Sequence, residues 1–302
     1  MNNEQIEEAR AFLADLSENS PQLPYEPQIL PGLFAASREG SSASIIDLTV
    51  LIESSPNLAA KILSVANSSL YALECTVTSL QRAISVLGFR EVRNIALMLG
   101  AASFLKAAKL PQRFDFLAFW RHELQTAAVA RTVVSTLNGA ACVHSTEKKG
   151  VLCISPDEAY AIGLLHDMGK VFLALRCPRI WYAIEELGRT ENLSFTEAEN
   201  LYWGMDHALI GAQVMHYWRI PLKLTDPINW HHAPSMAPSF VPEAKLLAAA
   251  DILANEGLDE KGGLPEAAFA MMPEGVDPVK MALALHPVLS GDLAGFFEEF
   301  AG

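Results

Sequence analysis

Residues 155–175 read SPDEAYAIGLLHDMGKVFLAL, and this stretch decides how the chain folds. Ser155 and Glu158 stand three residues apart before an apolar run, which is the capping box of a helix start. The apolar run itself, residues 159–175, has the length and composition of a helix buried in the core. The stretch therefore predicts a core helix whose first residue is Pro156.

Three polar residues interrupt the apolar run, namely His166, Asp167 and Lys170. They keep the run from being a membrane span, because a span needs about 20 apolar residues. A buried aspartate costs free energy unless it is paired or binds a cation, so Asp167 predicts a polar site in the core. Lys170 follows His166 by four residues, on the same face of the expected helix, where its ammonium could neutralise phosphate. The plainer alternative is a lysine that pairs with a glutamate.

Further histidines and an aspartate on other segments extend this polar site. Asp251 shares a helix stripe with Ala244 and Leu247, so its carboxylate is also expected to face the core. Imidazole and carboxylate suit Zn, Fe and Mn, and one carboxylate can bridge two metal ions. The set predicts a dinuclear hydrolytic centre, or the remains of one. The alternative is a hydrogen-bonded His/Asp network that ties helices together without metal. The predicted ligands are His122, His166, Asp167, His207, His231, His232 and Asp251.

Two of these ligand pairs are neighbours in the sequence, His166 with Asp167 and His231 with His232. Neighbours on a helix point about 100° apart, so we expect both members of a pair to reach one site only near its edge. The remaining histidines are expected to lie outside the site, and they are His144, His216 and His286.

Helical periodicity runs through most of the chain and period-two alternation is scarce, so the predicted fold class is all-α. The prolines between residues 20 and 31 predict an extended or broken segment, and Pro221 and Pro227 are expected to frame a short helix. Gly88 predicts a tight turn between two short helices. The other helices are expected at residues 3–17, 41–54, 56–73, 79–87, 90–105 and 116–137, and from Ser194, His207 and Pro242 onward.

The chain changes character at residues 110–114, where Pro111 lies in a polar break. We therefore expect an N-terminal helical bundle over residues 1–112 and a metal-site subdomain over residues 113–257. Residues 258–302 are predicted to form an acidic helical tail.

The bulk composition restricts the partners of the chain. Lysine and arginine number 22 against 35 aspartates and glutamates, a net charge of −13 that opposes binding of a nucleic acid polymer. A small nucleotide in a pocket stays possible. The acidic start lacks the apolar segment of a secretory signal, and no segment predicts a membrane span. The four cysteines show no C-x-x-C spacing and are typical of a reduced, cytoplasmic protein.

The phrases quoted so far resemble the HD superfamily of metal-dependent phosphohydrolases, and in particular its HDOD branch, the HD-related output domain. The most telling phrase is SSPNLAAKILSVANSSLY at residues 54–71, and the likeness extends over residues 20–256. Other matching phrases are residues 79–88, 119–122, 163–170, His207 with Gly211, 218–221 and 231–232.

The resemblance implies an all-α fold of two packed helical subdomains, with the HD-like helical bundle C-terminal. HDOD proteins are bacterial signalling modules, and many lack a full ligand set and act through protein contacts. This chain departs from that pattern because its set is complete, in the order found in the related HD-GYP phosphodiesterases. It also departs from those enzymes after His232, because Ala233, Pro234 and Ser235 stand where those enzymes have the sequence motif that recognises cyclic di-GMP.

Two functions follow from these features, and of the two we expect the regulatory module, with a retained metal site, and keep the enzyme as the alternative. The resemblance favours a regulatory module that binds a signalling protein through its N-terminal bundle, around residues 56–105. The intact ligand set favours a metal-dependent phosphohydrolase that acts on a nucleotide or another phosphate ester with one or two divalent ions of Fe, Mn, Zn or Ni. In that enzyme Asp167 would bridge the metals and Lys170 would bind phosphate oxygens. One metal would be held by His122, His166 and Asp251, and the other by His207, His231 and His232.

Overall fold

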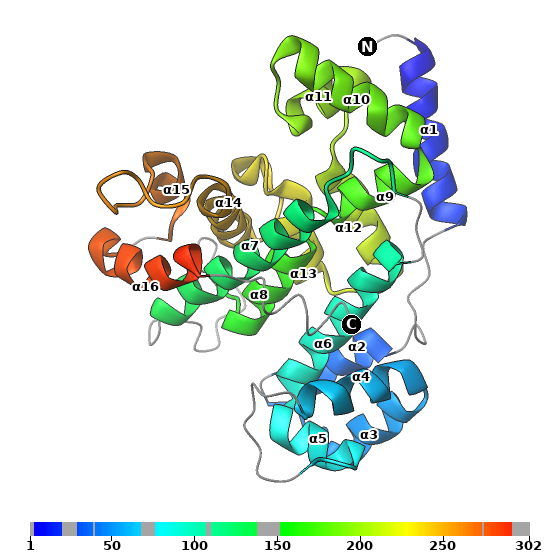
Figure 1. The fold of residues 1–302 in the computed structure, drawn as a ribbon, viewed down its shortest axis with the longest axis vertical. Coiled ribbons are helices and arrows are strands. Elements are labelled where there is room, and N and C mark those ends of the chain that lie inside the picture. Colours follow the sequence, from blue (N-terminus) through cyan, green and yellow to red (C-terminus); the bar gives the residue numbers. More distant parts are fainter. Residues whose placement is uncertain are drawn as a thin grey trace. The chain divides into compact units, whose positions relative to one another are not determined.

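The structure is a computed structural model that is all-α, with helices and no strand among the residues it describes (Figure 1). The chain forms two compact units: unit 1 comprises Met1–Glu18, Lys109–Val214 and Leu222–Gly302, and unit 2 comprises Asn19–Ala108 and Met215–Pro221. Among the helices described, none is both long and apolar enough to cross a membrane. The described residues are 3–19, 29–38, 40–67, 76–106, 110–137, 152–273 and 275–291.

Unit 2 is a small helical bundle whose turns follow local sequence signals. Ser55 caps α4 with Pro56 in its first turn, as predicted. Gly88 has φ of 80°, which permits the tight turn between α5 and α6. Asn67 ends α4 and exchanges hydrogen bonds with the backbone of Val77. Residues 68–73 of the helix predicted over residues 56–73 lie outside the described residues. The helices are α2 (Ile29–Ser37), α3 (Ile45–Glu53), α4 (Pro56–Ala66), α5 (Leu80–Leu87) and α6 (Phe89–Lys106).

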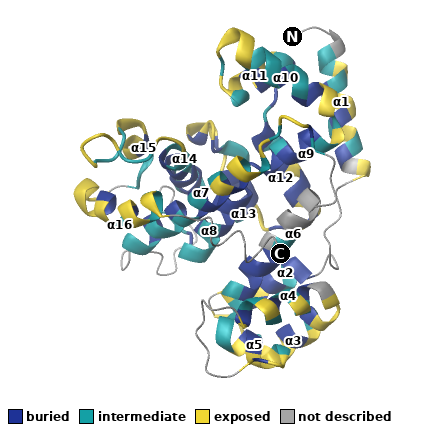
Figure 2. Cartoon of the chain, viewed as in Figure 1, coloured by how far each residue is buried: buried dark blue, intermediate teal, exposed yellow. Residues whose placement is uncertain are grey.

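Unit 1 is the larger helical body. Helix α7 packs against α8, α14 and α16, and α13 packs against both α8 and α14. Buried residues gather along α9, α13 and α14 in Figure 2. The helices are α1 (Asn3–Glu18), α7 (Phe116–Thr136), α8 (Pro156–Leu165), α9 (Met168–Arg176), α10 (Pro178–Glu191), α11 (Phe195–Trp203), α12 (His207–Tyr217), α13 (Leu222–Trp230), the 3₁₀ turn η2 (Pro234–Met236), α14 (Val241–Glu256), α15 (Glu266–Met271) and α16 (Pro278–Ser290). The last residues of α12, from Met215 on, belong to unit 2.

Helix α1 belongs to unit 1, whereas the sequence suggested that it joins the N-terminal bundle. The ring of Phe12 lies 5.3 Å from that of Trp203 on α11, and Glu8 pairs with Arg179 on α10. These contacts group residues 1–18 with unit 1, which differs from the predicted division. Helices α15 and α16 also belong to unit 1, because they pack against α14 and α7.

The single core helix predicted for residues 159–175 is wrong in one respect, because it breaks in two. His166 ends α8 and Asp167 begins α9. Close packing of glycines on both sides of the break explains the change of direction. A Cβ on Gly163 would lie 2.6 Å from Cα of Ala127 on α7, and one on Gly169 would lie 1.9 Å from the carbonyl oxygen of His207. The two half-helices thus follow different neighbours.

Two predictions based on proline are also corrected. Residues 29–31 are helical, since Pro31 occupies the first turn of α2, where proline is tolerated; residues 20–28 lie outside the described residues. Pro227 lies inside α13 and does not end it. Buried Leu224 and Ile228 hold α13 against its neighbours on both sides of the proline.

Candidate metal centre

The predicted ligands meet in unit 1, and most of them lie at helix ends. His166 and Asp167 form the junction of α8 and α9, and His231 and His232 follow the last residue of α13. At a helix end the backbone leaves the helical path, so two residues adjacent in sequence can point toward the same site. The divergence of about 100° expected for adjacent residues within a helix therefore does not apply to these two pairs. His207 begins α12. His122 and Asp251 come from within α7 and α14.

The carboxylate of Asp167 lies at the middle of the set. Its Oδ1 lies 2.8 Å from Nε2 of His207, 3.5 Å from Nε2 of His166 and 3.9 Å from Nε2 of His231. Its Oδ2 lies 3.8 Å from Nε2 of His122. Asp167 is 1% exposed, so a single buried carboxylate faces four imidazoles.

The other ligand atoms complete two groups around this carboxylate. Nε2 of His122 lies 3.0 Å from Oδ1 of Asp251 and 3.2 Å from Nε2 of His166. On the other side, Nε2 of His232 lies 2.8 Å from Nε2 of His207. One group therefore contains His122, His166 and Asp251, and the other contains His207, His231 and His232, with ligand atoms of the latter and of Asp167 all within 4.8 Å.

Three of the imidazoles are oriented by acceptors on the side away from the site. Nδ1 of His166 lies 2.9 Å from the carbonyl oxygen of Gly163, and Nδ1 of His231 lies 2.7 Å from that of Ile228. Nδ1 of His207 lies 2.6 Å from a carboxylate oxygen of Glu199. An acceptor at Nδ1 fixes the proton there and leaves the lone pair of Nε2 free for a metal.

Two buried glutamates next to the site were missed by the sequence analysis. Glu199 is fully buried beside His207, and Glu123 is fully buried with a carboxylate oxygen 3.6 Å from Nδ1 of His166. A signal was available, because Glu199 lies between Phe195 and Trp203 at spacings of four along one stripe of α11. Burial raises the pKa of Glu123.

The pKa values of the imidazoles separate into two kinds. Burial alone would lower the pKa of His207, but the Glu199 carboxylate, followed by that of Asp167, raises it to about 9. The pKa of His166 is likewise raised, because Asp167 and Glu123 outweigh its burial. Burial and the charge on His166 lower the pKa of His231 to about 3. The site therefore concentrates positive charge next to Asp167.

The donor set fits a divalent transition metal. Nε2 of His231 is buried and makes no hydrogen bond within the described part of the chain. Buried polar atoms without partners are rare and costly in native proteins. A cation held between the imidazoles and the Asp167 carboxylate would satisfy this nitrogen, and it would take the place of the imidazole protons that Asp167 and Glu199 now favour. The His/Asp cluster could thus bind a metal ion.

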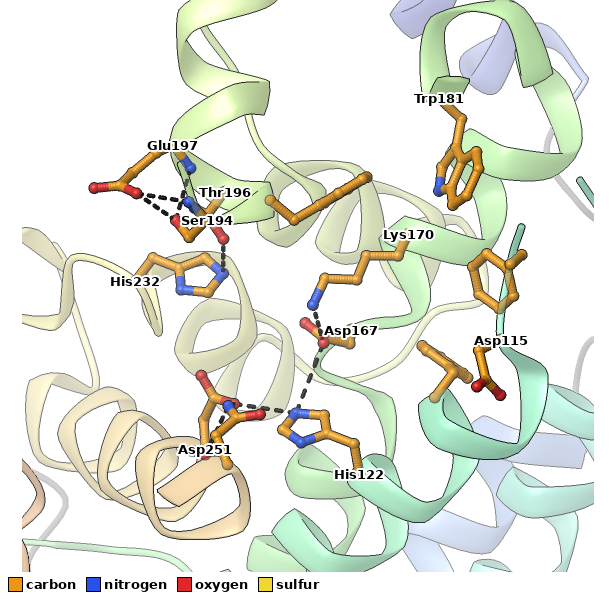
Figure 3. A pocket seen from close by; sticks show the side chains of 14 residues that line it. Asp115, His122, Asp167, Lys170, Trp181, Ser194, Thr196, Glu197, His232 and Asp251 are labelled. Atoms are coloured by element: carbon orange, nitrogen blue, oxygen red, sulfur yellow. Dashed lines mark hydrogen bonds and ion pairs between the residues drawn. The ribbon is translucent and has the colours of Figure 1, made fainter. Parts of the chain in front are cut away.

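A cavity of about 770 Å³ opens onto the cluster (Figure 3). His122, Asp167, His232 and Asp251 reach its wall, so a small molecule could touch the cluster directly. Lys170 also lines the cavity, and its ammonium pairs with Asp167 and not with the glutamate considered from sequence. Lys170 belongs to the first turn of α9 and does not share a helix with His166, because of the break between them.

The remaining histidines lie away from the cluster where they are described. His216 on α12 and His286 on α16 are both exposed and do not line the cavity. His144 lies outside the described residues.

Comparison with known proteins assigns the family. The HDOD domain model matches residues 23–234, which is most of the chain. A protein from Treponema pallidum (strain Nichols), described as uncharacterized, is 22% identical over 230 residues. That match covers 76% of this chain but 40% of the relative, so the chain spans less than half of the relative's length.

Three solved structures share the fold. An HDOD domain protein from Geobacter sulfurreducens has a TM-score of 0.70 at 20% identity, with 98% of this chain and 97% of that chain covered. A proposed signal transduction protein from Marinobacter aquaeolei VT8 has a TM-score of 0.72 at 22% identity, with 99% and 66% covered. A proposed phosphohydrolase from Shewanella amazonensis SB2B has a TM-score of 0.62 at 20% identity, with 93% and 98% covered.

At these identities the solved structures show a common fold and nothing about activity. The family model carries the assignment, and it agrees with the resemblance found in the sequence phrases. The chain belongs to the HDOD family.

Proposed function

We propose that this protein is a metal-dependent phosphohydrolase. The observation that carries the proposal is the buried carboxylate of Asp167, which lies between two groups of imidazoles at the wall of an open cavity. A structural His/Asp network would need neither a cavity beside it nor an unpartnered ligand nitrogen such as Nε2 of His231. Family membership supports the fold of such an enzyme but not its activity.

Each residue of the set has a role in the proposed enzyme. His122, His166 and Asp251 would hold one ion, and His207, His231 and His232 would hold the other. Asp167 has an oxygen toward each group and would bridge the ions. Bound divalent ions would lower the pKa of water and neutralise phosphate charge.

Lys170 would act on the phosphate itself. Its ammonium lines the cavity next to Asp167, and Asp167 raises the pKa of Lys170 against the opposing effect of burial, so the ammonium keeps its charge. A fixed positive charge beside the ions would bind a phosphate oxygen and stabilise the negative charge of the transition state.

The test begins with metal. Protein purified without chelator is expected to contain one or two equivalents of Fe, Mn, Zn or Ni by elemental analysis, and to hydrolyse members of a panel of phosphate esters after supplementation with the same metals. Asp167→Asn should lose the activity. Asp226→Asn is the matched control, because Asp226 is a buried aspartate of unit 1 outside the cavity. Absence of stoichiometric metal after supplementation would contradict the proposal.

A second candidate is the regulatory module that the family resemblance favours. The observation that supports it is an exposed apolar face on α3 of unit 2, where Ile46 is 63% and Val50 is 65% exposed one turn apart. Exposed apolar side chains at neighbouring positions are a feature of surfaces that bind other proteins. A signalling protein would be the partner.

A complementation assay in the native host separates the two functions. If the module is the function, Ile46→Ser with Val50→Ser should abolish signalling, and Asp167→Asn should leave it intact. If phosphohydrolase activity is the function, Asp167→Asn should abolish signalling, and the α3 double variant should reduce signalling only slightly. Circular dichroism shows whether each variant is folded. A folded Asp167→Asn protein with full signalling would show that phosphohydrolase activity is not the role of this protein in the cell.

A further inference from the structure

A continuous aromatic wall lines the cavity beside the metal cluster. The ring of Phe114 lies 5.5 Å from that of Phe119 and 5.9 Å from that of Trp181. The ring of Trp181 lies 6.3 Å from that of Phe195, which in turn lies 6.4 Å from the imidazole of His207. All four aromatic residues line the cavity, so the wall runs from its outer part to the cluster.

This wall is accessible in part and is not simply core. Phe114, Phe119 and Phe195 are half-buried. Trp181 is 6% exposed, and its ring contacts those of Phe114 and Phe195. Three elements supply the rings: the start of α7, α10 and the start of α11. In Figure 3 Trp181 and Lys170 lie on the same side of the cavity, with Asp167 between Lys170 and His122.

The charges around the cavity are unequal. Lys170 is the cationic side chain among the residues that line it, and its ammonium already pairs with Asp167. Two exposed carboxylates, those of Asp115 and Glu197, line the cavity outside the cluster. Asp115 caps α7 and Glu197 belongs to the capping box of α11, so both carboxylates are held in place.

We propose that the cavity selects a phosphate monoester whose organic part is a planar aromatic ring, with a single phosphate at the cluster and the ring on the aromatic wall. This inference rests on the proposed phosphohydrolase function. Water oxygen would bond to phosphorus, the ester P–O bond would break, and the leaving oxygen would take a proton. The products are a hydroxylated aromatic compound and inorganic phosphate.

The geometry explains both halves of this selectivity. The four aromatic side chains line the same cavity as Asp167, His122 and His232, so a ring attached to the phosphate through one ester oxygen can lie on the wall while the phosphate lies at the cluster. Stacking of a planar ring on aromatic side chains stabilises the complex and needs no polar contacts to the ring. Asp115 and Glu197 add negative charge to the cavity outside the cluster, so additional phosphates would meet repulsion between like charges there.

Binding of two phosphonates tests the aromatic wall without catalysis. Phenylphosphonate and methylphosphonate carry the same anionic group, are not esters, and differ in the ring. By calorimetry on the metal-supplemented protein, phenylphosphonate is expected to bind about tenfold more tightly, the gain typical of one stacked ring. Equal binding of the two, or binding of neither, would overturn the inference.

Two variants locate the effect. Phe114→Leu with Phe195→Leu keeps apolar volume but removes two rings, and it should reduce the preference for phenylphosphonate without weakening methylphosphonate. Phe269→Leu is the control, because Phe269 is an exposed ring on α15 outside the cavity. An unchanged preference in the double variant would show that the wall does not hold the ring.

Hydrolysis tests the limit on phosphate number. Phenyl phosphate is expected to be a better substrate than phenyl triphosphate by at least about tenfold in kcat/KM. Asp115→Asn with Glu197→Gln keeps both caps, because asparagine and glutamine serve at these positions, and it should narrow that difference. A preference for the triphosphate, or no effect of the double variant, would overturn this part of the inference.

The two levels of failure are distinguishable. If no phosphate ester is hydrolysed with any of the four metals, the proposed function fails, while the phosphonate comparison still decides whether the wall holds a ring. If glycerol phosphate and phenyl phosphate are hydrolysed equally well, the proposed phosphohydrolase function holds and the proposed selectivity for an aromatic ring is wrong.

Discussion

His207 depends on a carboxylate that does not reach the cavity. Glu199 is fully buried, and its oxygen lies 2.6 Å from Nδ1 of His207 and 3.2 Å from the backbone nitrogen of the same residue. These two contacts fix both the position and the tautomer of the imidazole. Glu199 is therefore a positioning residue for the proposed metal site.

Glu199→Gln should weaken metal binding by about 10- to 100-fold, the usual effect of losing an outer carboxylate partner of a ligand histidine. Competition with a chelator of known affinity measures the change. Glu243→Gln is the matched control, because Glu243 is equally buried in unit 1 and accepts a hydrogen bond from the backbone of Cys153, away from the cluster. Equal affinities of both variants and the unmodified protein would exclude the positioning role.

A second prediction at this scale concerns Glu158 in the capping box of α8. Burial alone would raise the pKa of Glu158, but the Lys223 ammonium at 2.9 Å and the backbone N–H of Ser155 lower it below its usual value. A depressed folded-state pKa stabilises the protein above the unfolded value of about 4.3, and the contribution is lost as pH falls through the folded value.

Glu158→Gln should therefore cost about 1 kcal/mol at pH 7, a modest figure because the pair is partly exposed to solvent. The difference in thermal unfolding should shrink steadily below pH 4. Glu260→Gln, at an exposed loop position, should leave the melting temperature unchanged at every pH. A difference that stays constant down to pH 3 would show that the Glu158 charge is not its source.

At the scale of elements, the contact between α9 and α12 sets the distance from Asp167 to His207. A Cβ on Gly169 would lie 1.9 Å from the carbonyl oxygen of His207 and 2.9 Å from the backbone nitrogen of Gly211. No side chain fits between the two helices at this point. The absence of side chains on Gly169 and Gly211 thus brings two ligands of the proposed site together.

Gly169→Ala should separate α9 from α12, destabilise unit 1 by about 1–3 kcal/mol and weaken metal binding as well. Gly32→Ala on α2 is the control, because its Cβ would meet only the mobile end of the Leu51 side chain, at 2.6 Å. Thermal unfolding and metal titration of both variants provide the measurements. A Gly169→Ala protein that melts and binds metal normally would show that the helices can move apart without cost.

Sequence could predict most of the helices, because caps and prolines act locally. Ser155 and Ser194 start α8 and α11 with complete capping boxes, as expected from their spacing to glutamates. It could not predict the break at His166, because an apolar run has the same composition whether it forms one buried helix or two. Packing of Gly163 against Ala127 decides that point, and such a contact is between residues far apart in the chain.

The metal-ligating residues of the candidate site could be predicted from the sequence, but the contacts of the buried glutamates that position them could not. Imidazoles and carboxylates that metals prefer stand out in an apolar sequence, and all seven predicted residues come together. Glu123 does not stand out, since a glutamate on a helix is most often solvated, and only the packing of α7 shows that it is buried. Glu199 had a sequence signal in its spacing of four from Phe195 and Trp203, but its contact with His207 depends on packing.

At the scale of the whole molecule, the cluster is built from unit 1 alone. Removal of metal should therefore destabilise unit 1, because a metal ion bound only by the folded cluster stabilises the folded state. Metal at 100 times its dissociation constant would stabilise the folded state by about 2.7 kcal/mol, so EDTA should lower the melting temperature. An unchanged melting curve, from protein shown beforehand to contain metal, would exclude a structural role for the ion.

Hydrogen exchange should locate this effect within the chain. Metal is expected to slow exchange in peptides from α7, α9, α12 and α14, which carry the ligands, and to leave α3, α4 and α5 of unit 2 unchanged. Equal protection of both sets of helices would show that the units unfold as one.

The spread of the ligands along the chain has a consequence for biosynthesis. The ligand residues run from His122 to Asp251, in helices that are made one after another. At about 5–20 residues per second, the ribosome adds the last carboxylate roughly 6–26 seconds after the first imidazole. Once His232 has been added and before Val241 is reached, the nascent chain carries every histidine of the cluster and none of α14. Complete metal capture is therefore a late event, and any ion acquired earlier must be exchanged or re-coordinated when Asp251 arrives.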